Sequence, residues 1–312
     1  MMIEWQKARD AIMDMNANDG IAANREYKDR LFTFIFGKEE NRPYLLQLYN
    51  ALNGTSYTDP SELEITTLQD VIYIRQKNDI SFLLDSELSL YEQQSSYNPN
   101  MPLRGLMYFS ALYRQFLSRQ GTDLYSSSLV KIPSPRYVVF YNGLRELPDV
   151  SKLRLSDAFE IPDVSGEFEW TATVYNVNAG RNPAIMESCA ALAQYADFIR
   201  WVRENSETMP AKDAVDAAVR QAIAQNYLNG FFKKHREEVV DVSLTEFNEE
   251  EFVRNRLKEG EARGVAKGVV QGEARLGKLV SLLLKQGLID LAQLVADDVQ
   301  EREKQYQRFG ID

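Results

Sequence analysis

The stretch NDISFLLDSELSLYEQQS, residues 78–95, decides the fold of this chain. It holds two short apolar segments, DISFLL and LSLYEQQ, and predicts a β-hairpin with a two-residue turn at Asp85-Ser86. In the register that this turn sets, Asp79 lies directly opposite Glu92. Cross-strand partners project from the same side of a sheet, so the hairpin is expected to bring two carboxylates face to face.

The polar end of this hairpin is a candidate metal site. Gln94 lies two residues beyond Glu92 and therefore projects from the same side. Two carboxylates placed together either retain a proton or enclose a cation, and Mg²⁺ is held by such oxygen ligands with water. An ordinary solvent-facing strand end, with Asp79 capping a turn, explains the pattern as well. A register shift of one residue would separate the carboxylates.

The composition excludes several kinds of site. The chain has 312 residues, 44% of them hydrophobic, which allows a large core with a substantial extension. Its single cysteine, Cys189, and single histidine, His235, rule out an internal disulfide and a zinc site with Cys/His spacing. Cys189 is expected to be a small buried residue. The net charge of −10 argues against a protein that coats nucleic acid, but not against an enzyme with a local basic surface.

The sequence contains no targeting or spanning signal. Its first residues, MMIEWQKARDAIMDMN, lack the apolar segment of a secretory signal, and no run of 18 apolar residues occurs. We therefore expect a cytoplasmic protein without a membrane partner.

Hydrophobic periodicity predicts an α/β chain. The helical pattern has a 3.6-residue period, whereas the strands are β-branched or apolar runs bounded by Pro and Gly. Helices are expected at residues 26–36, 42–54 and 103–117, and strands at 64–75, 79–84, 88–94, 133–143 and 167–180.

The chain after residue 181 is expected to be helical. Amphipathic patterns cover residues 183–204, 213–235 and 276–297. No Pro-rich or Ser-rich linker precedes them, so the first two can dock on the same body as the strands. We expect three parts: a core at residues 1–181, a helical region at 182–250 and a tail at 251–312.

The tail contains the only internal repeat. In KEGEARGVAKGVVQGEARLG, glycines recur every four residues. Each glycine weakens a solvated helix by roughly 1 kcal/mol relative to alanine. Small residues at this spacing also permit close contact between helices. Two readings stay open: a flexible, partly helical arm, or a contact in an oligomer. The glycines are Gly260, Gly264, Gly268 and Gly272, with Gly277 following out of phase.

Several segments together carry a resemblance to a known family. They are KDRLFTFIFG, the hairpin with the following NPNMPLRGLMYFSALY, and PSPRYVVFYNG. The pattern D-(x)₁₂-E-x-Q in the hairpin is a variant of the PD-(D/E)xK nuclease signature, with Gln94 in place of the usual lysine. Over about residues 25–200 the chain resembles the recombination-promoting nuclease (Rpn) and putative transposase family.

This resemblance implies a fold, a cofactor and a reaction. The fold is restriction-endonuclease-like, a mixed sheet flanked by helices, and the reaction is Mg²⁺- or Mn²⁺-dependent cleavage of DNA phosphodiester bonds. Asp79 and Glu92 would hold the metal, with the Gln93 carbonyl as a further ligand. Asp29 matches the upstream acid of the family's D-x-x-F pattern, and Gln94 would orient the attacking water.

Basic residues near the hairpin are candidates for contact with DNA. Lys77 lies two residues before Asp79, and Arg104 and Tyr108 share one face of a helix at i, i+4 spacing. Arg114 belongs to a locally basic stretch at residues 104–136. A surface contact explains the pair of Arg104 and Tyr108 equally well, and a solvated helix face explains the stretch at 104–136 equally well.

The leading hypothesis is therefore a homodimeric, metal-dependent DNA endonuclease acting in recombination, DNA mobility or phage defence. The glycine tail is a candidate dimer element. Two alternatives stay open: a catalytically silent member that binds DNA or a protein, and a helical scaffold assembled through the tail.

Overall fold

The computed structural model describes residues 31–66, 79–125, 127–162 and 165–311. Two of the predicted site residues, Asp29 and Lys77, lie outside these ranges, as does most of the strand expected at 64–75. The chain divides into two compact units, Met1–Asn248 and Glu249–Asp312.

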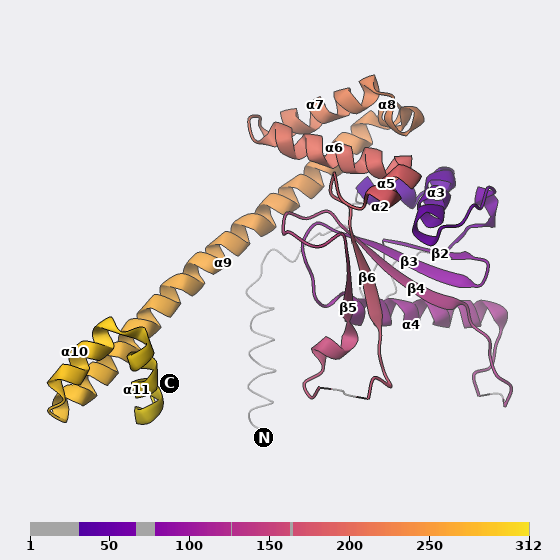
Figure 1. Ribbon diagram of the computed structural model, residues 1–312. Helices are drawn as coiled ribbons and strands as arrows, with labels where there is room; N and C mark the ends of the chain where they lie inside the picture. The colour runs from indigo at the N-terminus through magenta and orange to yellow at the C-terminus, as the bar shows by residue number, and fades with distance from the viewer. Residues whose placement is uncertain (1–30, 67–78, 126, 163–164, 312) are drawn as a thin grey trace, which may run out of the picture. The chain divides into compact units, whose positions relative to one another are not determined.

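A six-stranded mixed sheet forms the centre of the first unit (Figure 1). The strand order is β1-β2-β3-β4-β6-β5, and the three neighbours β3, β4 and β6 run parallel while the other pairs are antiparallel. The α/β class and the mixed sheet are thus confirmed. The strands are β1 (Glu64–Ile65), β2 (Ile80–Leu84), β3 (Glu87–Gln94), β4 (Ser134–Tyr141), β5 (Val150–Arg154) and β6 (Thr171–Asn176).

The hairpin of β2 and β3 has the predicted register. Leu84 pairs with Glu87 and Ile80 pairs with Tyr91, so the next position places Asp79 opposite Glu92. Asp85 takes a left-handed backbone conformation with φ of 50°, which a tight turn between twisted strands requires.

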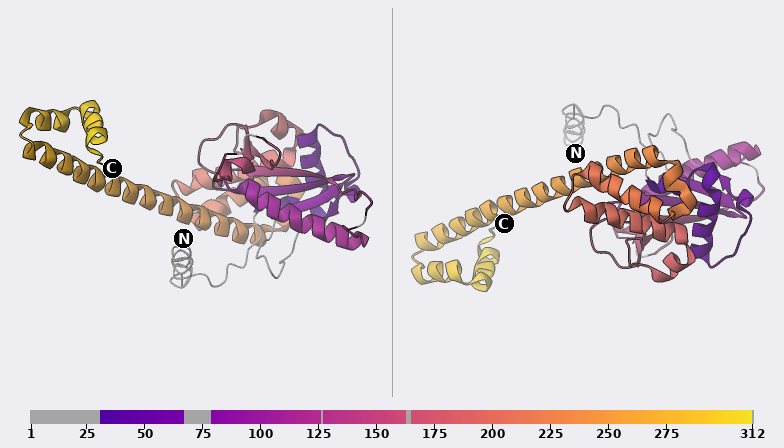
Figure 2. Two further views of the ribbon diagram at one scale, coloured as in Figure 1. Left: turned by 90° about the horizontal axis from the view of Figure 1, so that it is seen from below. Right: turned by 90° about the horizontal axis from the view of Figure 1, so that it is seen from above.

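Helices cover both faces of the sheet (Figure 1). One face packs against α4 (Met101–Gln120), which lies across the strands when seen from below (Figure 2). Because both faces are covered, β3 is buried along almost its whole length on alternating sides. On the opposite side of the sheet lie α2 (Leu31–Phe36), α3 (Arg42–Asn53), α5 (Pro183–Ser188) and α6 (Ala190–Ser206). Helix α7 (Ala211–Ala224) packs on α6, and α8 (Phe231–Lys234) packs on α7.

Two of the predicted helices are interrupted. The pattern at 183–204 divides at Cys189, which has a non-helical backbone. The pattern at 213–235 ends at Ala224 and continues through a turn in which Leu228 has a left-handed backbone. Tertiary hydrogen bonds hold this turn: the Leu228 N–H donates to Gln194 (2.7 Å), and the Tyr44 hydroxyl donates to the Leu228 carbonyl (2.7 Å).

The second unit is helical. Helix α9 (Arg236–Lys285) begins in the first unit and continues through the glycine repeat, followed by α10 (Ile289–Asp297) and α11 (Val299–Phe309). The prediction of a single helix at 276–297 is wrong. Gly287 adopts a left-handed backbone with φ of 77°, which ends α9 before α10 begins. The turn lets α10 and α11 pack on α9 around a small core of Leu279, Leu283, Ala292, Val295 and Tyr306.

Short 3₁₀ helices complete the first unit, at Glu39–Asn41, Pro60–Glu62, Leu155–Ala158 and Tyr227–Gly230. None of the described helices is both long enough and apolar enough to cross a membrane.

Candidate functional site

Asp79 and Glu92 are locked together at the open end of the hairpin. The Asp79 backbone N–H donates to Oε1 of Glu92 (3.0 Å), and the Gln93 N–H donates to Oδ2 of Asp79 (2.7 Å). Each carboxylate therefore accepts a backbone hydrogen bond from the strand of the other. Glu92 is only 1% exposed, so it does not lie on a solvent-facing strand end.

Arg104 neutralises this buried carboxylate. Its Nη2 lies 3.1 Å from Oε2 of Glu92 and also donates to the Tyr108 hydroxyl (3.0 Å). Burial opposes the charge on Arg104 most strongly, but the charge of Glu92 and the Tyr108 hydroxyl outweigh it and raise the pKa of Arg104. The guanidinium is thus a permanent cation at the site. The predicted pair of Arg104 and Tyr108 on one helix face is confirmed, with its charge directed at Glu92.

The two glutamines of β3 point in opposite directions. Gln93 donates through its side chain to Asn142 (2.7 Å), which in turn donates to the Tyr195 hydroxyl (2.9 Å) on the α6 side of the sheet. Strand alternation places Gln94 on the side of Glu92. Its side-chain amide makes no hydrogen bond to any residue that the structure describes. No residue in the described part of the chain therefore uses the hydrogen-bonding groups of the Gln94 amide.

A close approach of α4 to the sheet brings Arg104 to Glu92. A Cβ atom on Gly105 would lie 2.3 Å from Cε1 of Tyr137 and 3.0 Å from Nε1 of Trp170. Only glycine permits this distance between the helix backbone and the Tyr137 ring. The position of the guanidinium thus depends on a neighbouring glycine that the sequence did not single out.

Tyr137 is the site residue that sequence reasoning missed. It pairs with Leu90 in β4 and belongs to the core between the sheet and α4, the side that carries Glu92. Its hydroxyl is buried and has no hydrogen-bond partner in the described part of the chain. Burial, followed by the charge of Glu92, raises the pKa of Tyr137 well above its usual value. The alternation of β4 could have placed Tyr137 on this side, had the pairing with β3 been known.

The donor set suits a hard divalent cation. Asp79 and Glu92 supply carboxylate oxygens, and Mg²⁺ is typically held by one or two carboxylates with water and substrate oxygens. No cluster of three or more His, Cys, Asp or Glu side chains arranged for a metal occurs among the residues described. The two carboxylates of the hairpin thus constitute the candidate metal centre, and Asp29 lies outside the described ranges.

The other predicted basic contacts lie away from this centre or outside the described residues. Arg114 is exposed on α4, ten residues beyond Arg104, which is about 15 Å along a helix. Further along the basic stretch, Arg119 pairs with Glu64 at 3.0 Å. The stretch at 104–136 therefore does not form one continuous positive surface, since acidic residues engage Arg104 and Arg119 within it.

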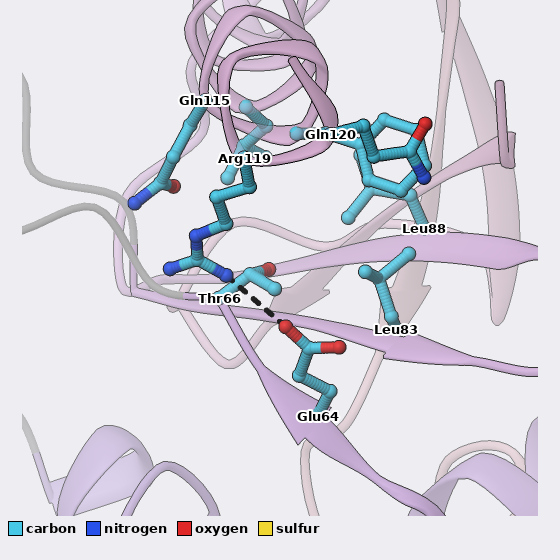
Figure 3. Close-up of a pocket in the computed structure, with 9 residues that line it drawn as sticks. Glu64, Thr66, Leu83, Leu88, Gln115, Arg119 and Gln120 are labelled. Atoms are coloured by element: carbon cyan, nitrogen blue, oxygen red, sulfur yellow. Dashed lines mark hydrogen bonds and ion pairs between the residues drawn. The ribbon is translucent and has the colours of Figure 1, made fainter. Parts of the chain in front are cut away.

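A separate cavity lies at the turn end of the hairpin (Figure 3). It has a volume of about 170 Å³, and its lining includes Leu83, Leu88 and the ion pair of Glu64 and Arg119. A neighbouring hollow of about 430 Å³ shares Glu64 and Leu83 with it. Both lie at the end of β2 and β3 opposite to Asp79, so they are not part of the candidate metal centre.

Comparison with known proteins gives no assignment. No family model matches the sequence, and neither the curated proteins nor the solved structures include a significant match. The family membership suggested by the resemblance accordingly stays a prediction.

Proposed function

We propose that this chain is a metal-dependent DNA endonuclease with a restriction-endonuclease-like fold of the PD-(D/E)xK type. The observation that carries the proposal is the reciprocal hydrogen bonding of Asp79 and Glu92, which holds two carboxylates together at one end of a hairpin. Carboxylate oxygens arranged in this way, together with water, are the ligands that Mg²⁺ typically takes in proteins. A role in recombination, DNA mobility or phage defence rests on the resemblance.

Each residue of the site has a role in phosphodiester hydrolysis. Asp79, Glu92 and the carbonyl of Gln93 would hold Mg²⁺ or Mn²⁺. When bound, such a metal polarises the scissile phosphate and lowers the pKa of a water ligand. Gln94 orients the attacking water through its side-chain amide, whose hydrogen bonds are not used by the described residues.

Arg104 supplies the positive charge that Gln94 lacks. In the usual signature a lysine occupies the third position, and glutamine cannot provide its electrostatic stabilisation. The Arg104 guanidinium lies 3.1 Å from Glu92 and stays protonated at any physiological pH. It is placed to stabilise charge that develops on a phosphate bound at the two carboxylates.

Plasmid cleavage with and without metal tests the proposal. We expect nicking or linearisation with Mg²⁺ or Mn²⁺, loss of activity with EDTA, and loss in Asp79→Asn and Glu92→Gln. Metal binding measured by calorimetry should weaken in both variants. Lys212→Gln, at an exposed position in α7, serves as a control for the loss of a surface charge and should cleave normally. Wild-type protein that neither binds metal nor cleaves DNA would remove the proposal.

A catalytically silent DNA-binding or protein-binding protein is the second candidate. It is favoured by the ion pair itself, because Arg104 already offsets the charge of Glu92 and leaves less need for a metal. In that case DNA binding is expected without metal binding, and Asp79→Asn should leave the DNA affinity unchanged.

A further inference from the structure

An aromatic ring and a cation stack beside the candidate metal centre. The guanidinium carbon of Arg145 lies 4.4 Å from the centroid of the Tyr97 ring. Tyr97 is 37% exposed, and Arg145 is exposed as well. Arg145 forms no ion pair with any described acidic residue, in contrast to Arg104 and Arg119. Its charge is therefore available to a ligand.

Backbone contacts fix the loops that carry this pair. Tyr97 follows β3, three residues after Gln94, and Arg145 follows β4. A Cβ atom on Gly143 would lie 2.3 Å from the carbonyl oxygen of Ser95, so the two loops touch through their backbones. The pair is thus held at the carboxyl ends of two parallel strands, next to the end of the hairpin that carries the carboxylates.

A hydrogen bond fixes the Arg145 side of the pair. The Tyr141 hydroxyl donates to the Arg145 carbonyl at 3.1 Å, which holds the backbone of this loop against β4. The side chain of Arg145 stays at the surface while its backbone is restrained. A restrained cation on an aromatic ring loses less conformational entropy when a ligand binds than a free arginine would.

The chemistry of the pair matches an unpaired nucleotide. Aromatic rings stack on exposed bases, and arginine contributes a cation–π contact to the ring and an ionic contact to phosphate. The bases of an intact duplex are stacked on one another and cannot cover a surface tyrosine. We propose that Tyr97 and Arg145 bind an unpaired nucleotide next to the scissile phosphate. The preferred substrate is then a single-stranded or frayed nucleic acid, an inference that rests on the proposed nuclease function.

Nearby acids provide internal controls. Asp149 is engaged by Arg181 at 3.5 Å, whereas Glu146 is exposed directly after Arg145 and adds negative charge at this surface. If phosphate approaches Arg145, then Glu146→Gln should strengthen binding. Tyr125 is 98% exposed and lies in a loop after α4, so Tyr125→Ala is a matched control for the loss of an exposed tyrosine.

Fluorescence anisotropy with labelled oligonucleotides tests the inference. Full-length protein in EDTA is titrated against a 20-nucleotide single strand and against the duplex of the same sequence, at one fixed salt concentration. We expect tighter binding of the single strand. Tyr97→Ala and Arg145→Ala should each weaken it about tenfold, within the range for loss of a stacked base. Tyr125→Ala should bind as the wild type does.

The outcomes separate this inference from the proposed function. Equal affinity for single strand and duplex, or unchanged affinity in Tyr97→Ala, overturns the inference even if the protein cleaves DNA with metal. A second outcome is a protein that binds the single strand through Tyr97 but shows no metal-dependent cleavage. That result supports the binding of an unpaired nucleotide and contradicts the proposed nuclease function. Circular dichroism of each variant shows whether a loss of binding reflects unfolding.

Discussion

Glu92 shows how a buried charge can be tolerated at the level of one residue. The structure surrounds its carboxylate with the Asp79 N–H and the Arg104 guanidinium, and only 1% of the residue is exposed. Removing one partner of a buried ion pair leaves the other charge without compensation. In the proposed metal site, a divalent cation bound to the same carboxylate would replace that compensation, so Arg104 would link stability to metal binding.

We therefore expect Arg104→Gln to destabilise the chain in a way that metal reverses. Because the arginine side chain is one-third exposed, the loss in unfolding free energy should be about 2 kcal/mol, below the 3–5 kcal/mol of a fully buried pair. Urea unfolding in EDTA measures the loss. Added Mg²⁺ should then stabilise Arg104→Gln more than the wild type. Equal stabilisation of both proteins by Mg²⁺ would show that Glu92 is not the metal ligand.

Removing the Tyr137 hydroxyl should raise stability. An unpartnered buried hydroxyl costs about 1–3 kcal/mol, and phenylalanine keeps the ring that packs on Gly105. Tyr137→Phe is therefore expected to raise the unfolding free energy by about 1 kcal/mol in urea titrations. Tyr113→Phe is the matched control, because its hydroxyl donates to the Pro133 carbonyl (2.8 Å) and its loss should lower stability. Destabilisation by Tyr137→Phe would indicate a water partner for that hydroxyl.

Cys189 is expected to be inert in the folded chain. The residue is fully buried, and burial raises the pKa of its thiol to about 11. The folded state thus favours the neutral thiol. The contribution of this thiol to the free energy of unfolding is therefore complete below pH 9, the ordinary pKa of a thiol. It is lost as the pH rises from 9 toward 11, because the thiol of the unfolded chain ionises first. At pH 8, a thiol reagent such as DTNB should react with the urea-unfolded chain but not with the folded one. Rapid reaction of the folded chain would contradict this burial.

At the level of elements, short-range turn chemistry was predictable and long-range packing was not. The Asp85-Ser86 turn alone sets the pairing of β2 with β3, so the opposition of Asp79 and Glu92 followed from the sequence. The edge strand β5, VSKLR, was missed because it is short and has only half-buried side chains on its inner face. The prediction of one helix at 276–297 missed the turn at Gly287, because apolar residues on both sides of the turn continue the helical pattern through it.

The residues of the candidate site that lie on the hairpin were predictable from the sequence, whereas those from other elements were not. Its two carboxylates and Gln94 lie on one hairpin, within reach of strand alternation. The residues around Glu92 come from other elements: Arg104 of α4 forms the ion pair with it, and Tyr137 of β4 belongs to the core on the same side of the sheet. Their arrangement depends on how closely α4 packs on the sheet, which no local pattern encodes.

Two helical glycines should respond oppositely to alanine. Gly105→Ala forces a Cβ atom against the Tyr137 ring, so we expect overpacking that costs about 1–3 kcal/mol of stability. Gly264→Ala meets no atom within 4 Å and should stabilise α9 by up to about 1 kcal/mol, because alanine is the better helix former. Thermal unfolding followed by circular dichroism measures both. A neutral Gly105→Ala would mean that α4 can move away from the sheet.

At the scale of the whole molecule, the two units have separate cores. The larger core of the first unit takes in Val239 of α9, with Phe247 packed against it, whereas the core of the second unit begins with Leu279 on the same helix. The two cores share no residue. Between them, Val265 and Val269 are 68% and 54% exposed at i, i+4 spacing on α9. Exposed apolar residues beside unobstructed glycines favour contact with another helix.

Truncation after Asn248 should therefore separate folding from assembly. The truncated chain keeps every residue of the first core, so we expect it to fold, and to bind metal if Asp79 and Glu92 do. If α9 forms the expected dimer contact, sedimentation equilibrium should give a dimer for the full chain and a monomer for the truncated one. Val265→Lys in the full chain should also give a monomer, while Lys278→Ala on the same helix should not. A truncated chain that still dimerises would place the contact in the first unit and leave the glycine repeat without that role.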